Sequence, residues 1–193
     1  MILFEVILAS LLLSLLAGGS LRHLQDEPLT GEWALLLLLP VQMLWPGASQ
    51  RLGLGCSLSM IVWLLLMASL AVVLMLNAPR RWMLAFAALG IAANILVIGV
   101  NGAMPVSLKA GSEIGGTRVA VRADLGEECL HEAMDEATRL PFLADVIAIP
   151  GPVWQRGVLS VGDLLLVLGL GAWVFAASRR PPTRSRHDED SMH

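Results

Sequence analysis

Long apolar runs separated by short polar stretches dominate the pattern of this chain. The runs cover residues 2–17, 32–45, 56–76, 82–100 and 161–177. A helix needs roughly 20 mainly apolar residues to cross the hydrocarbon core of a bilayer, and most of the runs approach that length. The pattern therefore predicts an all-α integral membrane protein with five transmembrane helices.

Two of the runs need a closer look. The first has no Lys or Arg before Arg22, so a retained span is favoured over a cleaved signal peptide. The second is short and is interrupted by Pro40 and Gln42. A strained or tilted span is the favoured interpretation, and a re-entrant segment is the alternative. Residues 46–55 follow it and are expected to form a loop rich in Gly and Pro.

The composition agrees with a membrane protein. Of the 193 residues, 56% are hydrophobic and 15% are charged, and the mean hydropathy is +0.71. Soluble domains are nearer one quarter charged. With a net charge of −3 and no basic patch, nucleic acid is not expected as a partner. The expected partners are membrane lipids, with other envelope proteins or a membrane-embedded substrate as further possibilities.

The basic residues predict the orientation of the chain. With five spans, the turns after the first and third spans lie on the same side as the C-terminus. That side carries Arg22, Arg80, Arg81, Arg179, Arg180, Arg184 and Arg186, whereas the opposite short loop carries only Arg51. The positive-inside rule then places the C-terminus in the cytoplasm and the N-terminus outside.

Residues 101–158 form the largest polar region, and this orientation makes them an extracytoplasmic cap between the fourth and fifth helices. Residues 109–116 are expected to form a loop, and residues 117–123 an extended segment. A helix is predicted over 124–140, with Asp124 as its N-cap. That helix would place Glu127, His131 and Asp135 on one face, which is more typical of a solvated surface than of a metal site. No metal or cofactor is expected.

The two cysteines, Cys56 and Cys129, have neither zinc-site nor CxxC spacing. Both fall on the predicted outer side, where conditions are oxidising. They are therefore a disulfide candidate, and two free, half-buried thiols are the alternative.

Two asparagines lie on or near the fourth span, seven residues apart, at Asn94 and Asn101. This spacing places both on one helix face. The favoured interpretation of Asn94 is a hydrogen bond between helices rather than a ligand contact.

Two aspartates flank the turn that leads into the last apolar run. Asp145 precedes a connection broken by Pro and Gly, and Asp163 lies just inside the run. Ser160 stands three residues before Asp163, which is the spacing of a helix capping box and gives Asp163 an ordinary structural role. An ionisable residue at a membrane boundary is also a functional-site hypothesis. If the two carboxylates meet, they would share a proton, with Asp163 as the base and Asp145 as the acid, as in aspartic peptidases.

Three blocks of sequence carry a resemblance to a known family. They are NGAMPVS (101–107), TRLPFLADVIAIP (138–150) and LSVGDLLLVLG (159–169). Together they resemble a family of bacterial membrane proteins, the domain of unknown function 5317. The resemblance implies a polytopic protein of the bacterial plasma membrane and supplies no activity.

Residues 139–171 are also similar to the end of the lipoprotein signal peptidases. That family has one aspartate before the last span and another at its start, so the resemblance implies catalytic roles for Asp145 and Asp163. Asn101 lies in a segment similar to the family's N-x-G-A, and Ser160 stands where the family has the Asn of N-x-A-D. These two residues are therefore candidate binding residues.

The sequence predicts four parts. They are a four-helix membrane region (1–100), the extracytoplasmic cap (101–158), the last transmembrane helix (159–178) and a disordered cytoplasmic tail (179–193). The favoured function is an envelope scaffold, accessory or binding protein. The alternative is an intramembrane aspartic peptidase resembling lipoprotein signal peptidase, which would use Asp145 and Asp163.

Overall fold

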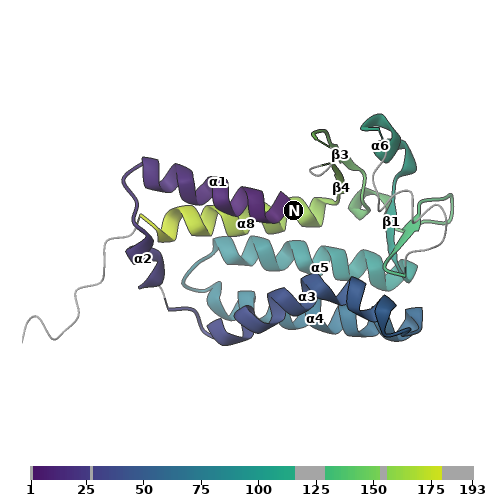
Figure 1. Ribbon diagram of the computed structural model, residues 1–193, viewed down its shortest axis with the longest axis horizontal. Helices are drawn as coiled ribbons and strands as arrows, with labels where there is room; N and C mark the ends of the chain where they lie inside the picture. Colours follow the sequence, from purple (N-terminus) through teal and green to yellow (C-terminus); the bar gives the residue numbers. More distant parts are fainter. Residues whose placement is uncertain (1, 27, 116–128, 153–155, 180–193) are drawn as a thin grey trace, which may run out of the picture.

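The computed structural model describes residues 2–26, 28–115, 129–152 and 156–179 (Figure 1). Five long helices lie alongside one another, and the cap sits at one end of them. The helices are α1 (Ile2–Leu16), α3 (Glu32–Arg51), α4 (Cys56–Asn77), α5 (Met83–Asn101) and α8 (Val161–Ala177). Their positions agree closely with four of the five apolar runs.

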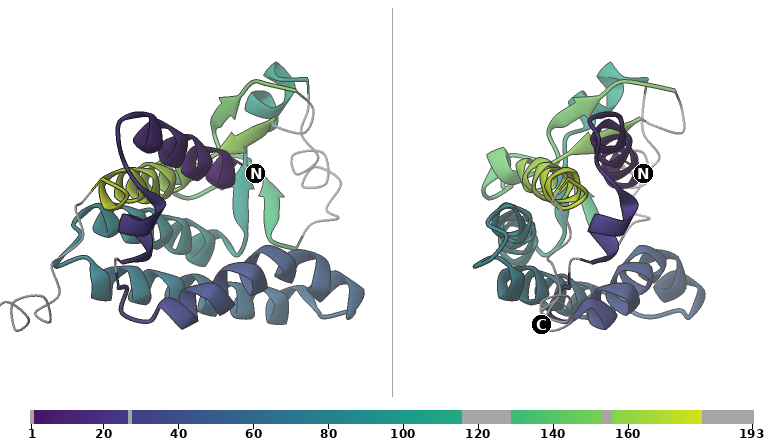
Figure 2. Two further views of the ribbon diagram at one scale, coloured as in Figure 1. Left: turned by 60° about the vertical axis from the view of Figure 1, so that its left-hand side comes forward. Right: turned by 90° about the vertical axis from the view of Figure 1, so that its left-hand side faces the viewer.

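The long helices pack in the order α1, α8, α5, α4, α3. In the end-on view of Figure 2 they form an open arc, with α1 and α3 at its two ends. A short helix, α2 (Leu21–Gln25), joins the first long helix to the rest of the arc. The last helix of the chain is therefore an inner member of the bundle, next to both α1 and α5.

The interface between α5 and α8 depends on residues without side chains. A Cβ added to Gly169 would lie 2.6 Å from the backbone nitrogen of Ala87 and 2.7 Å from the carbonyl oxygen of Met83. Small residues of this kind allow two helix backbones to approach closely, which is the usual basis of helix association in membranes. The α8 backbone is thus held tightly against α5.

Two of the described helices, α4 and α5, are long and apolar enough to cross a membrane. The helices α1 and α8 are also apolar, with 15 and 17 residues, and are shorter than a typical span. The α3 helix has 20 residues and contains two prolines. The predicted number of five spans therefore goes beyond what helix length and composition support.

The prediction for the second run was wrong at its C-terminal end. The structure continues α3 through Pro40 and Pro46 to Arg51, in place of the loop expected over 46–55. A proline removes one backbone hydrogen bond from a helix, but neighbouring groups hold this one together. Trp45 donates its indole N–H to the carbonyl oxygen of Ser59 on α4 at 2.9 Å, and the hydroxyl of Ser49 donates to the carbonyl of Pro46 at 3.1 Å.

The cap contains two small sheets. Parallel strands β1 (Met104–Val106) and β2 (His131–Ala133) form one, and antiparallel strands β3 (Ile147–Ile149) and β4 (Gly157–Leu159) form the other. A short helix, α6 (Leu108–Glu113), and a 3-10 turn, η1 (Pro141–Leu143), complete the described cap. The fold is mainly helical, and the all-α prediction missed these strands.

Two further predictions for the cap were wrong. Residues 109–116 were expected to be a loop, but most of them belong to α6, whose N-cap is the hydroxyl of Ser107. The segment 124–140 was predicted to be a helix, but its described part is not helical. His131–Ala133 pairs with β1 as a strand, and turns and bends follow it. The proposed row of acidic and histidine side chains on that helix is therefore also wrong. Asp124, Glu127, the segment 117–123 and the tail from residue 180 lie outside the described residues.

Candidate functional site

Strand β1 fixes the position of Asp145 in the cap. The backbone N–H of Asp145 donates to the carbonyl of Pro105 at 2.9 Å, and the N–H of Ser107 donates to the carbonyl of Asp145 at 2.8 Å. The opposite edge of β1 pairs with β2, where His131 is the register partner of Met104. One three-residue strand thus holds Asp145 on one side and His131 on the other.

The capping box predicted at the start of the last helix is confirmed. The hydroxyl of Ser160 accepts from the backbone N–H of Asp163 at 2.9 Å, and Oδ2 of Asp163 accepts from the backbone N–H of Ser160 at 3.1 Å. The reciprocal pair satisfies two donors that a helix N-terminus otherwise leaves unpaired. Asp163 is therefore locked at the first turn of α8.

Asn94 of α5 ties this capping box to the neighbouring helix. Its Nδ2 donates to Oδ1 of Asp163 at 2.8 Å, and its Oδ1 accepts from the hydroxyl of Ser160 at 2.9 Å. The hydrogen bond between helices that the sequence favoured for Asn94 is confirmed. Both carboxylate oxygens of Asp163 therefore accept hydrogen bonds.

Asp145 and Asp163 line the same small cavity. Its volume is about 150 Å³, and Asn94, His131 and Gln42 are also part of its wall. Apolar residues of α4, α5, β1 and α8 complete the lining. The fold thus brings together two carboxyl groups that the sequence separates by the β3–β4 hairpin. We call this space the acid cavity.

The Asp145 side chain is buried, and one of its carboxyl oxygens lacks a hydrogen-bond partner among the described residues. The residue is only 6% exposed, and the oxygen without a partner is Oδ1. Burial raises the pKa of Asp145 well above its usual range, and the nearby Asp163 carboxylate raises it further. A buried carboxyl group with this environment holds its proton where an exposed one would lose it. The site therefore contains one carboxyl group suited to donate a proton and a second that accepts hydrogen bonds at both oxygens.

Three members of the acid cavity were not predicted as site residues. Asn94 could have been found, because a polar side chain inside an apolar span is a signal of function as well as of packing. Gln42 gave a similar signal but was read only as an interruption of the second run. His131 was placed on the wrong type of element, so its approach to the aspartates through β2 was missed.

Asn101 lies at the end of α5 and holds the cap in place. Its side chain accepts from the N–H of Arg139 at 2.8 Å and donates to the carbonyl of the same residue at 2.9 Å. Leu140, the next residue, has a positive φ of 53°, which is unusual for a residue with a branched side chain. Asn101 is absent from the residues that line the acid cavity, so what the structure describes for it is a backbone clamp.

Cys56 and Cys129 form a disulfide, with the sulfur atoms 2.03 Å apart and the Cα atoms 5.0 Å apart. The bond joins Cys56, the first residue of α4, to Cys129, which directly precedes Leu130 in the cap. Leu130 and His131 both line the acid cavity. The disulfide therefore anchors one wall of the cavity to the helix bundle.

The comparisons with known proteins give one match. No curated protein and no solved structure is detectably similar to this chain. A family model described as a family of unknown function, DUF5317, matches residues 28–175. This match spans most of the chain, including α3 to α6, nearly all of α8 and every residue of the acid cavity. The chain belongs to the DUF5317 family.

Proposed function

We propose that this protein is an intramembrane aspartic hydrolase that acts on a membrane-embedded substrate. One observation carries the proposal: a buried carboxyl group with an unpartnered oxygen, Asp145, faces the same cavity as Asp163. Perturbed titratable groups that share a concave site are typical of catalytic centres. Aspartic peptidases use such a pair as a general acid and a general base.

The roles follow from the surroundings of each group. Asp163 accepts hydrogen bonds from Asn94 and from the backbone of Ser160, so it is the base that takes a proton from a water molecule. The water oxygen then bonds to the carbonyl carbon of the substrate, while Asp145 donates its proton to the carbonyl oxygen. When the resulting intermediate collapses, the bond to the leaving group breaks and the leaving group takes the proton held by Asp163. One hydroxyl of the intermediate returns its proton to Asp145 as the carbonyl re-forms, so both carboxyl groups regain their starting states.

A five-span topology in a bacterial plasma membrane is part of the same proposal. The uneven distribution of arginines favours a cytoplasmic C-terminus and an outer cap. With 17 residues, α8 is about 26 Å long, compared with a hydrocarbon core of about 30 Å. Local thinning of the bilayer accommodates a deficit of this size at modest cost. In this arrangement the acid cavity lies where the helices meet the outer surface.

A non-catalytic envelope scaffold or binding protein is the second candidate function. The observation that favours it is the complete hydrogen bonding of Asp163, because a capping box and an asparagine already account for that side chain. Under this alternative the acid cavity has a structural role only.

The experiment that separates the two functions replaces each aspartate with asparagine. Purified protein in lipid nanodiscs is assayed for cleavage of membrane-embedded amides, both envelope lipoprotein precursors and long-chain fatty amides. E136Q is a matched control because Glu136 is an exposed carboxylate of the same cap. The hydrolase proposal expects activity in the parent and in E136Q, and none in D145N or D163N. An inactive parent, or full activity in either aspartate variant, would leave the scaffold as the better function.

A further inference from the structure

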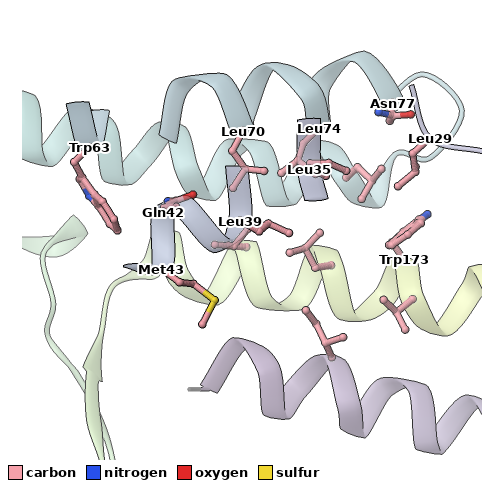
Figure 3. Close-up of a pocket in the computed structure, with 15 residues that line it drawn as sticks. Leu29, Leu35, Leu39, Gln42, Met43, Trp63, Leu70, Leu74, Asn77 and Trp173 are labelled. Carbon is pink, nitrogen blue, oxygen red and sulfur yellow. The ribbon is translucent and has the colours of Figure 1, made fainter. Parts of the chain in front are cut away.

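An apolar groove runs along the inside of the helix arc. It has a volume of about 350 Å³ and lies between α3 and α4 on one side and α8 and α1 on the other (Figure 3). Its walls are mainly leucines, including Leu35, Leu39, Leu70, Leu74, Leu166 and Leu170. A groove of this composition suits a hydrocarbon ligand rather than water or a polar one.

The groove lies beside the acid cavity. Gln42, Trp63 and Leu166 line both spaces, so the two share a wall. In Figure 3, Gln42 and Trp63 lie at one end of the groove, and Asn77 and Trp173 lie at the other. The buried Oε1 of Gln42 has no hydrogen-bond partner among the described residues. This unpaired hydrogen-bond acceptor therefore lies at the end of the apolar groove that adjoins the acid cavity.

The volume of the groove decides which kind of apolar ligand fits. An apolar cavity of about 150 Å³ binds benzene, so by the same ratio 350 Å³ holds a hydrocarbon chain of roughly fourteen carbons. The volume of the groove therefore suits a single hydrocarbon chain.

The far end of the groove adjoins a second hollow. Leu29, Leu35, Leu39 and Trp173 line both spaces, and the second, of about 390 Å³, is also lined by residues of α2. The end beside Gln42 is the one that adjoins the carboxyl groups, so the polar part of a ligand belongs there.

We infer that the substrate is an amphiphile with one linear hydrocarbon chain, which lies in the groove and presents a polar group to Asp145 and Asp163. The inference rests on the proposed hydrolase function and narrows its substrate class. The polar group carries an N–H or O–H that donates to Oε1 of Gln42. The bond that is cleaved lies next to this donor, on the side of the two carboxyl groups. The chain enters sideways from the membrane between α1 and α3, the two ends of the helix arc.

Photocrosslinking tests the inference. Full-length protein in phospholipid nanodiscs is exposed to a long-chain fatty amide with a diazirine near the end of its chain, and labelled peptides are identified by mass spectrometry. The label is expected on residues of α3, α4 and α8 that line the groove. Equal labelling of the outward faces of α4 and α5, for example at Leu65 and Leu89, would overturn the inference, since those side chains are exposed.

Two pairs of variants make the test specific. L39W and L170W put an indole into the groove, whereas L37W and L168W put the same group on the 70% and 64% exposed faces of the same helices. The added indole is expected to displace at least two carbons of the bound chain from the groove. The lost apolar contact weakens binding, so labelling is expected to fall roughly tenfold in L39W and L170W. Unchanged labelling in these two, or an equal loss in L37W and L168W, would contradict the inference.

The same samples separate this inference from the hydrolase proposal. Groove labelling in a parent protein that hydrolyses none of the substrates supports the chain site and argues against the hydrolase. Hydrolysis of a membrane-embedded amide without groove labelling supports the hydrolase and overturns the chain site.

Discussion

The contact between Asn94 and Asp163 gives the sharpest quantitative prediction. In N94A the carboxylate loses the donor at 2.8 Å, and the hydroxyl of Ser160 loses its acceptor at 2.9 Å. Neutral hydrogen bonds between membrane helices contribute about 0.6 kcal/mol on average. A hydrogen bond to a charged group contributes more, about 1.5–3 kcal/mol. We therefore expect N94A to lower the free energy of unfolding by about 2–4 kcal/mol, because both partners are left unpaired.

A double-mutant cycle isolates the part of this loss that belongs to the pair. N94A, D163A and the double variant are unfolded in mixed micelles by denaturant, and their free energies are compared with the parent. The coupling energy between the two positions is expected to be about 1.5–3 kcal/mol. S69A is the control, because Ser69 is an exposed residue of α4 whose hydroxyl donates only to its own helix, at Leu65. It should change the stability by less than about 0.5 kcal/mol.

A coupling energy below about 0.5 kcal/mol would refute the reasoning, because sites that do not interact are additive to within that limit. The hydrogen bonds of Asn94 with Asp163 and Ser160 would then follow from helix packing without contributing to stability. Asp163 would in that case be positioned by its capping box alone.

Three further predictions follow from the same structure. Because the pKa of Asp145 is raised in the folded protein, its contribution to stability falls as pH rises from the ordinary aspartate value toward the raised one. D145N should flatten that pH dependence, as measured by thermal unfolding across a pH series. An unchanged slope of stability against pH would contradict the raised pKa of Asp145. Removing the disulfide in C56S/C129S should cost about 4 kcal/mol, since the bond closes a loop across a separation of 73 residues. Denaturant unfolding of parent and variant measures this, and equal midpoints would show that the bond adds no stability. G169A should cost about 1–3 kcal/mol through overpacking against α5, whereas the control G99A should cost nothing, because nothing lies within 4 Å of its added Cβ. Equal thermal midpoints for the two glycine variants would contradict the packing argument.

The pattern of apolar runs predicted the long helices well. The last helix was placed at 161–177 and the structure has Val161–Ala177, because an apolar run with a capping box has a defined start. The third and fourth runs agree with α4 and α5 to within a residue at each end. The prediction for the second run failed because proline was taken to end the helix. Pro46 sits inside α3, whose neighbouring indole at Trp45 is anchored on α4, and the local sequence does not reveal that anchor.

The cap could not be predicted in the same way. Its strands have three residues each, which is too short for an alternating pattern to be recognised. Their pairing is also non-local: β1 joins β2, and the backbone of Asp145 bonds to the far edge of β1. The segment 124–140 has enough helix-forming residues to suggest a helix, but tertiary pairing overrides that preference at His131–Ala133.

The capping role of Asp163 and its proposed catalytic role depend on each other. A capping box alone usually explains an aspartate at the start of a helix, and the sequence offered it as the simpler interpretation. Yet the box, with Asn94, fixes both carboxylate oxygens in the first turn of α8, directly after the cap. Strand β1 independently fixes the backbone of Asp145 across the acid cavity. A pair of carboxyl groups needs a defined separation to share protons, and long flexible connections do not supply one. The structural contacts of Asp163 are therefore the means by which a catalytic pair would be positioned, and they count as support for the hydrolase rather than against it.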